Sequence, residues 1–172
     1  AGVLAALAMQ THARIAPRDP RPAAAAPAGW RGVNPAPRGV GLAFEPNAGQ
    51  AAPGVRFLAR GSGVTAFFTD SEAVMVLRRP VSGGALAAAS AVLRMRLEGA
   101  RPAPALAGAE RLPGVSNYLL GDDPARWRTG VPRYGRIRYQ AVYPGVDLEW
   151  YSSRGRLEYD FVLAPGADPR QI

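Results

Sequence analysis

Apolar and polar residues alternate in two runs near the C-terminal end of the sequence, within residues 142–163. Successive side chains of an extended strand point to opposite faces, so each run predicts a half-buried β-strand. Residues 152–155 separate the runs and predict a β-hairpin in which Tyr151 pairs with Arg156 across a four-residue loop. One face of this hairpin is apolar and comprises Val146, Leu148, Trp150, Leu157, Tyr159, Phe161 and Leu163.

The opposite face of the predicted hairpin is acidic. In the predicted register Glu149 lies opposite Glu158 and Asp147 lies opposite Asp160, and like charges that face each other destabilise a sheet. The preceding run, residues 134–140, alternates in the same way and carries arginines at polar positions. We therefore expect it to lie beside the hairpin and to neutralise the carboxylates. The candidate ionic or metal cluster comprises Asp147, Glu149, Glu158, Asp160, Arg136 and Arg138.

Two other chemistries suit a cluster of carboxylates. Paired carboxylates act as acid and base in glycoside hydrolysis, and clustered carboxylates bind calcium. The sequence contains no Asp-x-Asp-x-Asp-Gly loop, and carboxylates on an exposed strand face ordinarily belong to solvated ion pairs. We therefore favour an ionic ladder and assign no catalytic residue. We expect no cofactor. Ca²⁺ is the alternative, because it is the metal that such a carboxylate cluster would bind.

Short strands recur through the sequence from Phe44 onward, and no long run has the period of a helix. The pattern predicts an all-β fold, an antiparallel β-sandwich-like domain that we expect to lack strands at its C-terminal edge. One helical turn is expected at 122–127, with Asp123 as N-cap and Pro124 as its first residue. The predicted strands span residues 55–60, 64–69, 73–79, 92–98, 115–120 and 134–140, with a short strand around Leu106 and a variable loop at 80–91.

The beginning of the sequence has a different composition. Residues 1–13 form a short apolar run that ends in small residues, as in the apolar region and cleavage end of a secretory signal peptide. This run is too short to span a bilayer as a helix, so no transmembrane segment is expected. Residues 14–43 are rich in Pro, Ala and Arg and build no apolar face, which predicts a disordered linker. We expect the β-rich domain to occupy residues 44–172 of a longer exported precursor.

The net charge of +8 raises the question of nucleic-acid binding. All 21 basic residues are arginines, half of the positive excess lies in residues 1–43, and the other arginines alternate with acidic residues. Nucleic acid is therefore not expected as a partner. The absence of Lys excludes a P-loop, and the absence of Cys excludes disulfides and cysteine-based zinc sites. The one histidine, His12, lies in the leading segment, so residues 44–172 contain no histidine-based site.

Three aromatic residues, Trp127, Tyr143 and Tyr151, occupy positions at which we expect exposed side chains. Exposed aromatic rings form platforms on which a sugar or a peptide stacks. Aromatic residues at strand spacing more often pack in a core or at a sheet edge. If these rings are exposed, the partner that they would bind is a surface glycan or a protein ligand.

Several segments taken together resemble one family. It is the N-terminal domain, of no assigned activity, of bacterial secreted or cell-surface proteins that carry SBBP repeats of the β-propeller type. The resemblance implies export, a β-rich fold and a repeat array downstream in the same polypeptide, and it supplies no catalytic residue. The segments that carry it are FEPNAGQ (44–50), VRFLARGSG (55–63), SNYLLGDDPARWRTGVPRY (116–134), VYPGVDLEWY (142–151) and RLEYDFVLAPGADPRQI (156–172).

From these observations we expect a secreted or cell-surface protein. The domain is expected to be a non-enzymatic structural or adhesive module at the N-terminal end of a larger exported protein. The alternative is a carbohydrate-binding module, with or without calcium, and a glycoside hydrolase fragment is the third hypothesis.

Overall fold

The computed structural model of the chain describes residues 42–61, 63–78 and 91–172. The predictions of a signal-like segment at 1–13 and of a disordered linker up to residue 41 lie outside the described residues. The same is true of the variable loop predicted at 80–91 except for its last residue, Ala91, which begins a strand.

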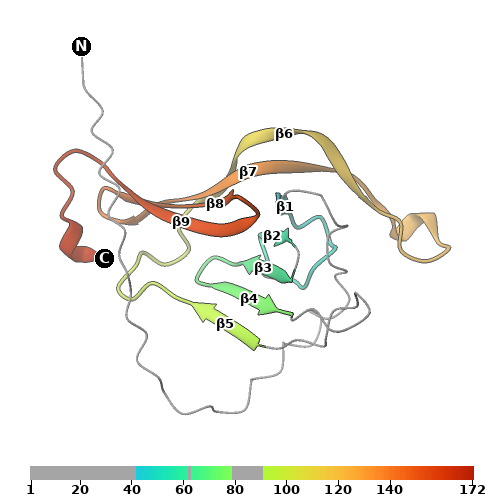
Figure 1. The fold of residues 1–172 in the computed structure, drawn as a ribbon, viewed down its shortest axis with the longest axis horizontal. Coiled ribbons are helices and arrows are strands. Elements are labelled where there is room, and N and C mark those ends of the chain that lie inside the picture. The colour runs from blue at the N-terminus through green and yellow to red at the C-terminus, as the bar shows by residue number, and fades with distance from the viewer. Residues whose placement is uncertain (1–41, 62, 79–90) are drawn as a thin grey trace.

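The described residues form nine β-strands and two single-turn 3₁₀ helices, and every strand pairing is antiparallel (Figure 1). The all-β prediction is confirmed. No helix within the described ranges is long and apolar enough to cross a membrane. The elements are β1 (Phe44–Pro46), β2 (Phe57–Arg60), β3 (Val64–Phe68), β4 (Ala73–Leu77), β5 (Ala91–Met95), β6 (Leu106–Tyr118), η1 (Pro124–Arg126), β7 (Arg128–Tyr143), β8 (Val146–Ser153), β9 (Arg156–Leu163) and η2 (Pro169–Gln171).

Hydrogen bonds link all the described strands into one curled sheet. The strand order is β5, β4, β3, β2, β1, β7, β8 and β9, and β6 pairs with the other edge of β7. A single residue pair, Phe44 with Tyr134, joins β1 to β7. The sheet folds over at this narrow joint, and Figure 1 shows β3, β4 and β5 lying below the layer of β6–β9. Because the strands form one continuous sheet, the finer prediction of a sandwich is not confirmed.

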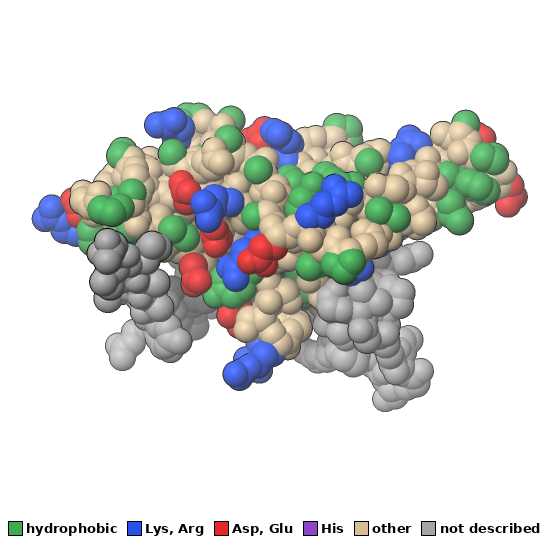
Figure 2. Space-filling view, turned by 90° about the horizontal axis from the view of Figure 1, so that it is seen from above, with side chains coloured by type: hydrophobic (Ala, Val, Ile, Leu, Met, Phe, Trp, Pro, Cys, Tyr) green, Lys and Arg blue, Asp and Glu red, His purple; other side chains and the backbone are tan. Residues whose placement is uncertain are grey.

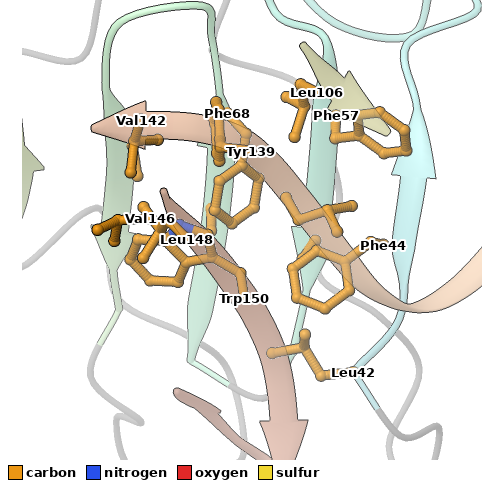
Figure 3. Packing of buried hydrophobic residues seen from close by; sticks show 14 of the residues in the cluster. Leu42, Phe44, Phe57, Phe68, Leu106, Tyr139, Val142, Val146, Leu148 and Trp150 are labelled. Atoms are coloured by element: carbon orange, nitrogen blue, oxygen red, sulfur yellow. The ribbon is translucent and has the colours of Figure 1, made fainter. Parts of the chain in front are cut away.

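The core lies between the two halves of the curled sheet and is built on aromatic rings. Phe68 of β3 packs edge-on against Trp150 of β8 with ring centroids 5.3 Å apart, and Phe44 packs on Phe68 at 5.6 Å. Figure 3 shows these rings between the two layers, with Tyr139 and Leu148 beside them. Aromatic pairs at such distances contribute about 0.5–1.5 kcal/mol each beyond the area that they bury. Side-chain packing between the two facing layers of the sheet therefore holds them together where hydrogen bonding between β1 and β7 is sparse.

The hairpin predicted at 142–163 is present, but its loop is shorter than expected. Ser153 pairs with Arg156, which leaves a two-residue loop, Arg154 and Gly155. Both loop residues have positive φ, 50° and 75°, as in the type I′ turn whose twist matches that of paired strands. The predicted register was therefore wrong by two positions. A shift of two keeps each side chain on its face, so the apolar pattern could not detect it.

Two strand predictions fell short of the real strands. Residues 99–114, whose apolar pattern is weak, contribute most of β6, and this strand pairs along most of β7. Its partner β7 begins at Arg128, six residues before the predicted run at Tyr134. Pairing with a neighbouring strand satisfies backbone N–H and C=O groups whatever the side-chain pattern, so both strands extend beyond their apolar alternation.

The N-terminal boundary of the domain also differs from the prediction. Leu42 and Ala43, predicted as the end of the disordered linker, are buried, and Leu42 belongs to the core. The predicted helical turn is confirmed as η1. Asp123 accepts a hydrogen bond from the backbone N–H of Ala125 at 3.0 Å, and Pro124 is the first residue of the turn.

The turn between β1 and β2 is tied by the side chain of Asn47. Its Oδ1 accepts hydrogen bonds from the amides of Gly49 and Ala51 at 3.0 and 3.1 Å. Its Nδ2 donates to the carbonyls of Ala52 and Val55 at 3.1 and 3.0 Å. One side chain thus supplies hydrogen-bond partners for four backbone groups of this turn, which gives the asparagine of the FEPNAGQ segment a structural role.

The two-residue hairpin loop makes opposite predictions for its two residues. Replacing Gly155 with Ala should lower the free energy of unfolding by about 1 kcal/mol, because a Cβ is strained at positive φ. Replacing Arg154 with Asn should raise it by about 0.5 kcal/mol, because Asn adopts positive φ more readily. Urea denaturation of both variants measures the difference, and two variants of unchanged stability would contradict the loop.

Candidate functional site

Acidic and basic side chains meet on the outer face of β7 and β8. Arg138 donates from Nε to Oε1 of Glu149 at 2.6 Å, and its terminal NH2 group makes a second, short contact with the same oxygen. Arg136 donates to the other oxygen of Glu149 at 3.4 Å. Glu149 is only 9% exposed. Figure 2 shows basic and acidic groups side by side near the middle of one face of the molecule. Glu149 is therefore a nearly buried carboxylate held between two guanidinium groups.

Two further carboxylates join this cluster. Asp147 accepts a hydrogen bond from the backbone N–H of Ala141 at 2.7 Å, at an irregularity of β7 where Ala141 has a φ of 49°, and lies 3.8 Å from Arg138. Glu110 of β6 accepts from Nε of Arg136 at 2.6 Å, and this bond raises the pKa of the guanidinium. Sequence reasoning missed Glu110 because the weak apolar pattern of its segment hid the strand.

Glu158 and Asp160 of β9 lie apart from the arginines. Asp160 pairs across strands with Glu149, and Glu158 pairs with Tyr151, as the two-position shift of register requires. Within the described ranges neither carboxylate forms an ion pair, so the predicted cluster is divided between β8 and β9. No group of three or more His, Cys, Asp or Glu side chains in the described part of the chain could hold a metal ion.

The three aromatic residues considered as a stacking platform do not lie together. Trp127 precedes the first residue of β7 and Tyr143 is its last, so about 50 Å of extended chain separates them. Tyr143 was predicted to be exposed, and this was wrong: it is 7% exposed and donates to the carbonyl of Glu98 at 2.8 Å. Burial raises the pKa of its hydroxyl. Tyr151 is half-buried beneath Arg136, whose guanidinium carbon lies 4.8 Å from the ring centre.

A second buried carboxylate lies where β1, β2 and β6 meet. Glu45 accepts short hydrogen bonds from the hydroxyls of Ser116 and Tyr118, and it lies 3.2 Å from a terminal nitrogen of Arg60. The guanidinium of Arg60 also stacks on the ring of Tyr118 at 4.7 Å. Burial, and then the bond to Glu45, raise the pKa of the Tyr118 hydroxyl. These groups pair with one another, so the cluster ties β6 to β1 and β2.

A cavity of about 130 Å³ lies beside the core. Its lining is mainly apolar, with Glu72 and Arg101 among the polar residues. Trp150 also lines it and is 2% exposed. Among the described residues the indole Nε1 of Trp150 is the one buried side-chain nitrogen or oxygen without a hydrogen-bond partner. An unpaired buried N–H costs about 1–3 kcal/mol. The lining comes from segments far apart in the chain, so no local sequence pattern could indicate the cavity.

Replacing Glu149 with Gln should lower the free energy of unfolding by about 2 kcal/mol, because two guanidinium groups lose their charged acceptor. Urea denaturation measures the change. The matched control is Asp168→Asn, which removes an ion pair with the exposed Arg170 and should leave stability unchanged. A Glu149→Gln variant as stable as the control would contradict a structural role for the ladder.

Comparison with curated proteins found no significant match to this chain, and comparison with solved structures found none either. A family match does cover three-quarters of the sequence. It spans residues 44–172, from the first residue of β1 to Ile172, and so includes every described strand. The family carries no assigned activity. The chain belongs to the family described as domain of unknown function DUF7948.

Proposed function

We propose that this domain is a non-enzymatic structural or adhesive module of a larger exported bacterial surface protein, with repeat domains downstream in the same polypeptide. The observation that carries the proposal is the pairing of Glu149 with Arg136 and Arg138. A carboxylate that serves as an acid or base needs a free oxygen within reach of the substrate. Both oxygens of Glu149 are already engaged by arginines that belong to the neighbouring strand.

The remaining carboxylates of the ladder support the same proposal. Asp147 caps a backbone amide of β7, and Glu110 binds the arginine that also contacts Glu149. Each of these bonds joins one strand to its neighbour. Together they strengthen the sheet against separation of β6, β7 and β8, as suits a domain that transmits force or contact at a surface.

The long ribbon of β6 and β7 offers a contact surface for adhesion. Figure 1 shows it projecting beyond the rest of the domain, with its turn at the far end. Leu119 and Leu120 lie between β6 and η1 and are 58% and 55% exposed. Neighbouring exposed leucines on a projecting turn favour contact with another surface, because burying them removes apolar area from water.

Expression of the full-length precursor in the bacterium that encodes it tests this proposal. We expect the protein in the medium or at the cell surface, where added protease cleaves it. We also expect that the variant Leu119→Ser/Leu120→Ser is exported normally but lowers adhesion of the cells severalfold, because it removes the apolar tip. The control Leu93→Ser, at an exposed leucine of β5, should leave adhesion unchanged.

Retention of the full-length protein in the cytoplasm would contradict the exported role. Normal export with equal adhesion of both variants would contradict the adhesive role of the tip and leave a purely structural one.

Carbohydrate binding is the second candidate function, and the cavity beside Trp150 favours it. Trp150 is among the lining residues, and an apolar wall next to polar groups suits the two kinds of surface of a sugar ring.

Titration of the domain with monosaccharides and short glycans, followed by NMR, tests this function. A ligand in the cavity should shift the indole N–H signal of Trp150, and Ala100→Leu, which fills the cavity wall, should abolish the shift. The same substitution at Ala125, an exposed residue of η1, is the control. Indole signals that no sugar moves would remove this candidate.

A further inference from the structure

The strand β9 lies at one end of the curled sheet and pairs with β8 alone among the described strands. The amide of Ala164 donates to the carbonyl of Gly145 at 2.8 Å, which makes this pair a hydrogen-bonded one. Hydrogen-bonded and non-hydrogen-bonded pairs alternate along antiparallel strands. The backbone groups that point away from β8 therefore belong to Leu157, Tyr159, Phe161 and Leu163.

The side chains of these same four residues continue the apolar face of the sheet beyond the core. The ring of Tyr159 lies 5.0 Å from that of Trp150 and 6.1 Å from that of Phe161, so the aromatic packing of the core runs out to the edge. Tyr159 is nevertheless 43% exposed, and Leu163 is 38% exposed. The edge thus combines unpaired backbone groups with an apolar row that is only half covered.

The outer face of the same strand carries Arg156, Glu158, Asp160 and Val162, so its acidic side chains outnumber the basic one. Arg136 and Arg138 lie on the far side of β8 and bind Glu149 and Asp147. Glu158 and Asp160 form a second acidic row next to the first. Within the described ranges neither forms an ion pair, although the Tyr151 hydroxyl hydrogen-bonds to Asp160. A strand beyond β9 with cationic side chains on this face would neutralise that row as β7 neutralises its neighbour.

The other two edges of the sheet are less suited to accept a strand. The pairing of β6 with β7 is irregular between Arg111 and Val115, a stretch that contains Pro113, and Glu110 just before it has a φ of 55°. β5 has five residues, and Arg94 is bound to Glu72. Irregularity, proline and short length are features that protect edges from pairing, and β9, with eight residues, has none of them.

A second copy of the same strand fits this edge poorly. In the two antiparallel registers of greatest overlap that pair the outward backbone groups, β9 would set Asp160 opposite Asp160 or Glu158 opposite Asp160. Like charges directly opposite each other destabilise a pairing. In these two registers the charge of the edge therefore disfavours a second copy and favours a partner of different sequence.

We propose that the outer edge of β9, which pairs with no other described strand, is a docking surface for one extended strand of a partner protein in which Arg or Lys alternates with apolar residues. The partner strand adds to the sheet by backbone hydrogen bonds to Leu157, Tyr159, Phe161 and Leu163. Its apolar side chains cover Tyr159 and Leu163, and its cationic side chains face Glu158 and Asp160. This proposal is independent of the adhesive tip and of the cavity.

A capped synthetic peptide of sequence YGRIRYQ is a suitable probe, because residues 134–140 present this alternation to β8 within the domain. NMR titration of the full chain should show saturable binding, with slowed hydrogen exchange at the outward amides of β9. A peptide with both arginines replaced by glutamate should bind at least about tenfold more weakly, since two cross-strand attractions become repulsions. A peptide N-methylated at alternate residues should lose the exchange protection.

Variants of the domain test the same charges from the other side. Glu158→Arg/Asp160→Arg should weaken binding of YGRIRYQ about tenfold or more and should improve binding of the glutamate peptide. The control Glu98→Arg/Asp122→Arg changes the net charge equally at two exposed positions away from β9 and should leave binding unchanged. Circular dichroism verifies that both variants fold.

Three results would overturn the proposal. One is failure of YGRIRYQ to bind the wild-type chain at millimolar concentration. Another is binding without protection of the β9 amides, which indicates charge attraction alone. The third is a concentration-dependent dimer, seen by light scattering, whose β9 amides are already protected without peptide, because a second copy then occupies the edge.

Discussion

The contact between Phe68 and Trp150 is the interaction on which the rest of this fold depends. β1 and β7 share one residue pair, so the hydrogen bonds fix the order of the strands but do not hold the two halves of the sheet against each other. Packing of an aromatic ring from β3 onto one from β8 brings the two halves together around a hydrophobic core. The same packing places Tyr139 and Leu148 beside the cavity and carries the apolar face outward to Tyr159.

The polar chemistry of the domain serves the same sheet. Glu149 is bound by two arginines of the next strand, and Glu45 is bound by groups from β2 and β6. Such buried or half-buried pairs are sensitive to the loss of one partner, because the other charge then stays desolvated. Within the described residues, the groups without such partners lie elsewhere: the buried indole N–H of Trp150, two exposed leucines at the ribbon tip and the outer edge of β9.

Much of the sheet was predictable, because most strands are short apolar or alternating runs separated by turn residues. The strands around Val64 and Ala73 and the hairpin at the C-terminal end are examples. The strand β6 was largely missed, since backbone pairing with β7 stabilises it without an apolar pattern. Glu110, which lies in this strand and forms an ion pair with Arg136, was therefore also missed. Tyr143 was predicted to be exposed because nothing in the neighbouring sequence indicated that the backbone carbonyl of Glu98 would accept a hydrogen bond from its hydroxyl.

The sequence by itself determined which side chains share a face, because alternation along a strand is a property of the extended backbone. It therefore identified the acidic face of β8 and β9 and the arginines of β7. Only the tertiary structure decided which of these charges meet. The type I′ turn at Arg154 and Gly155 set the register two positions away from the simplest pattern, and shifts of two leave the faces unchanged. The curl of the sheet likewise decided where the core lies and which described strands form its edges, since both depend on contacts between residues far apart in the chain.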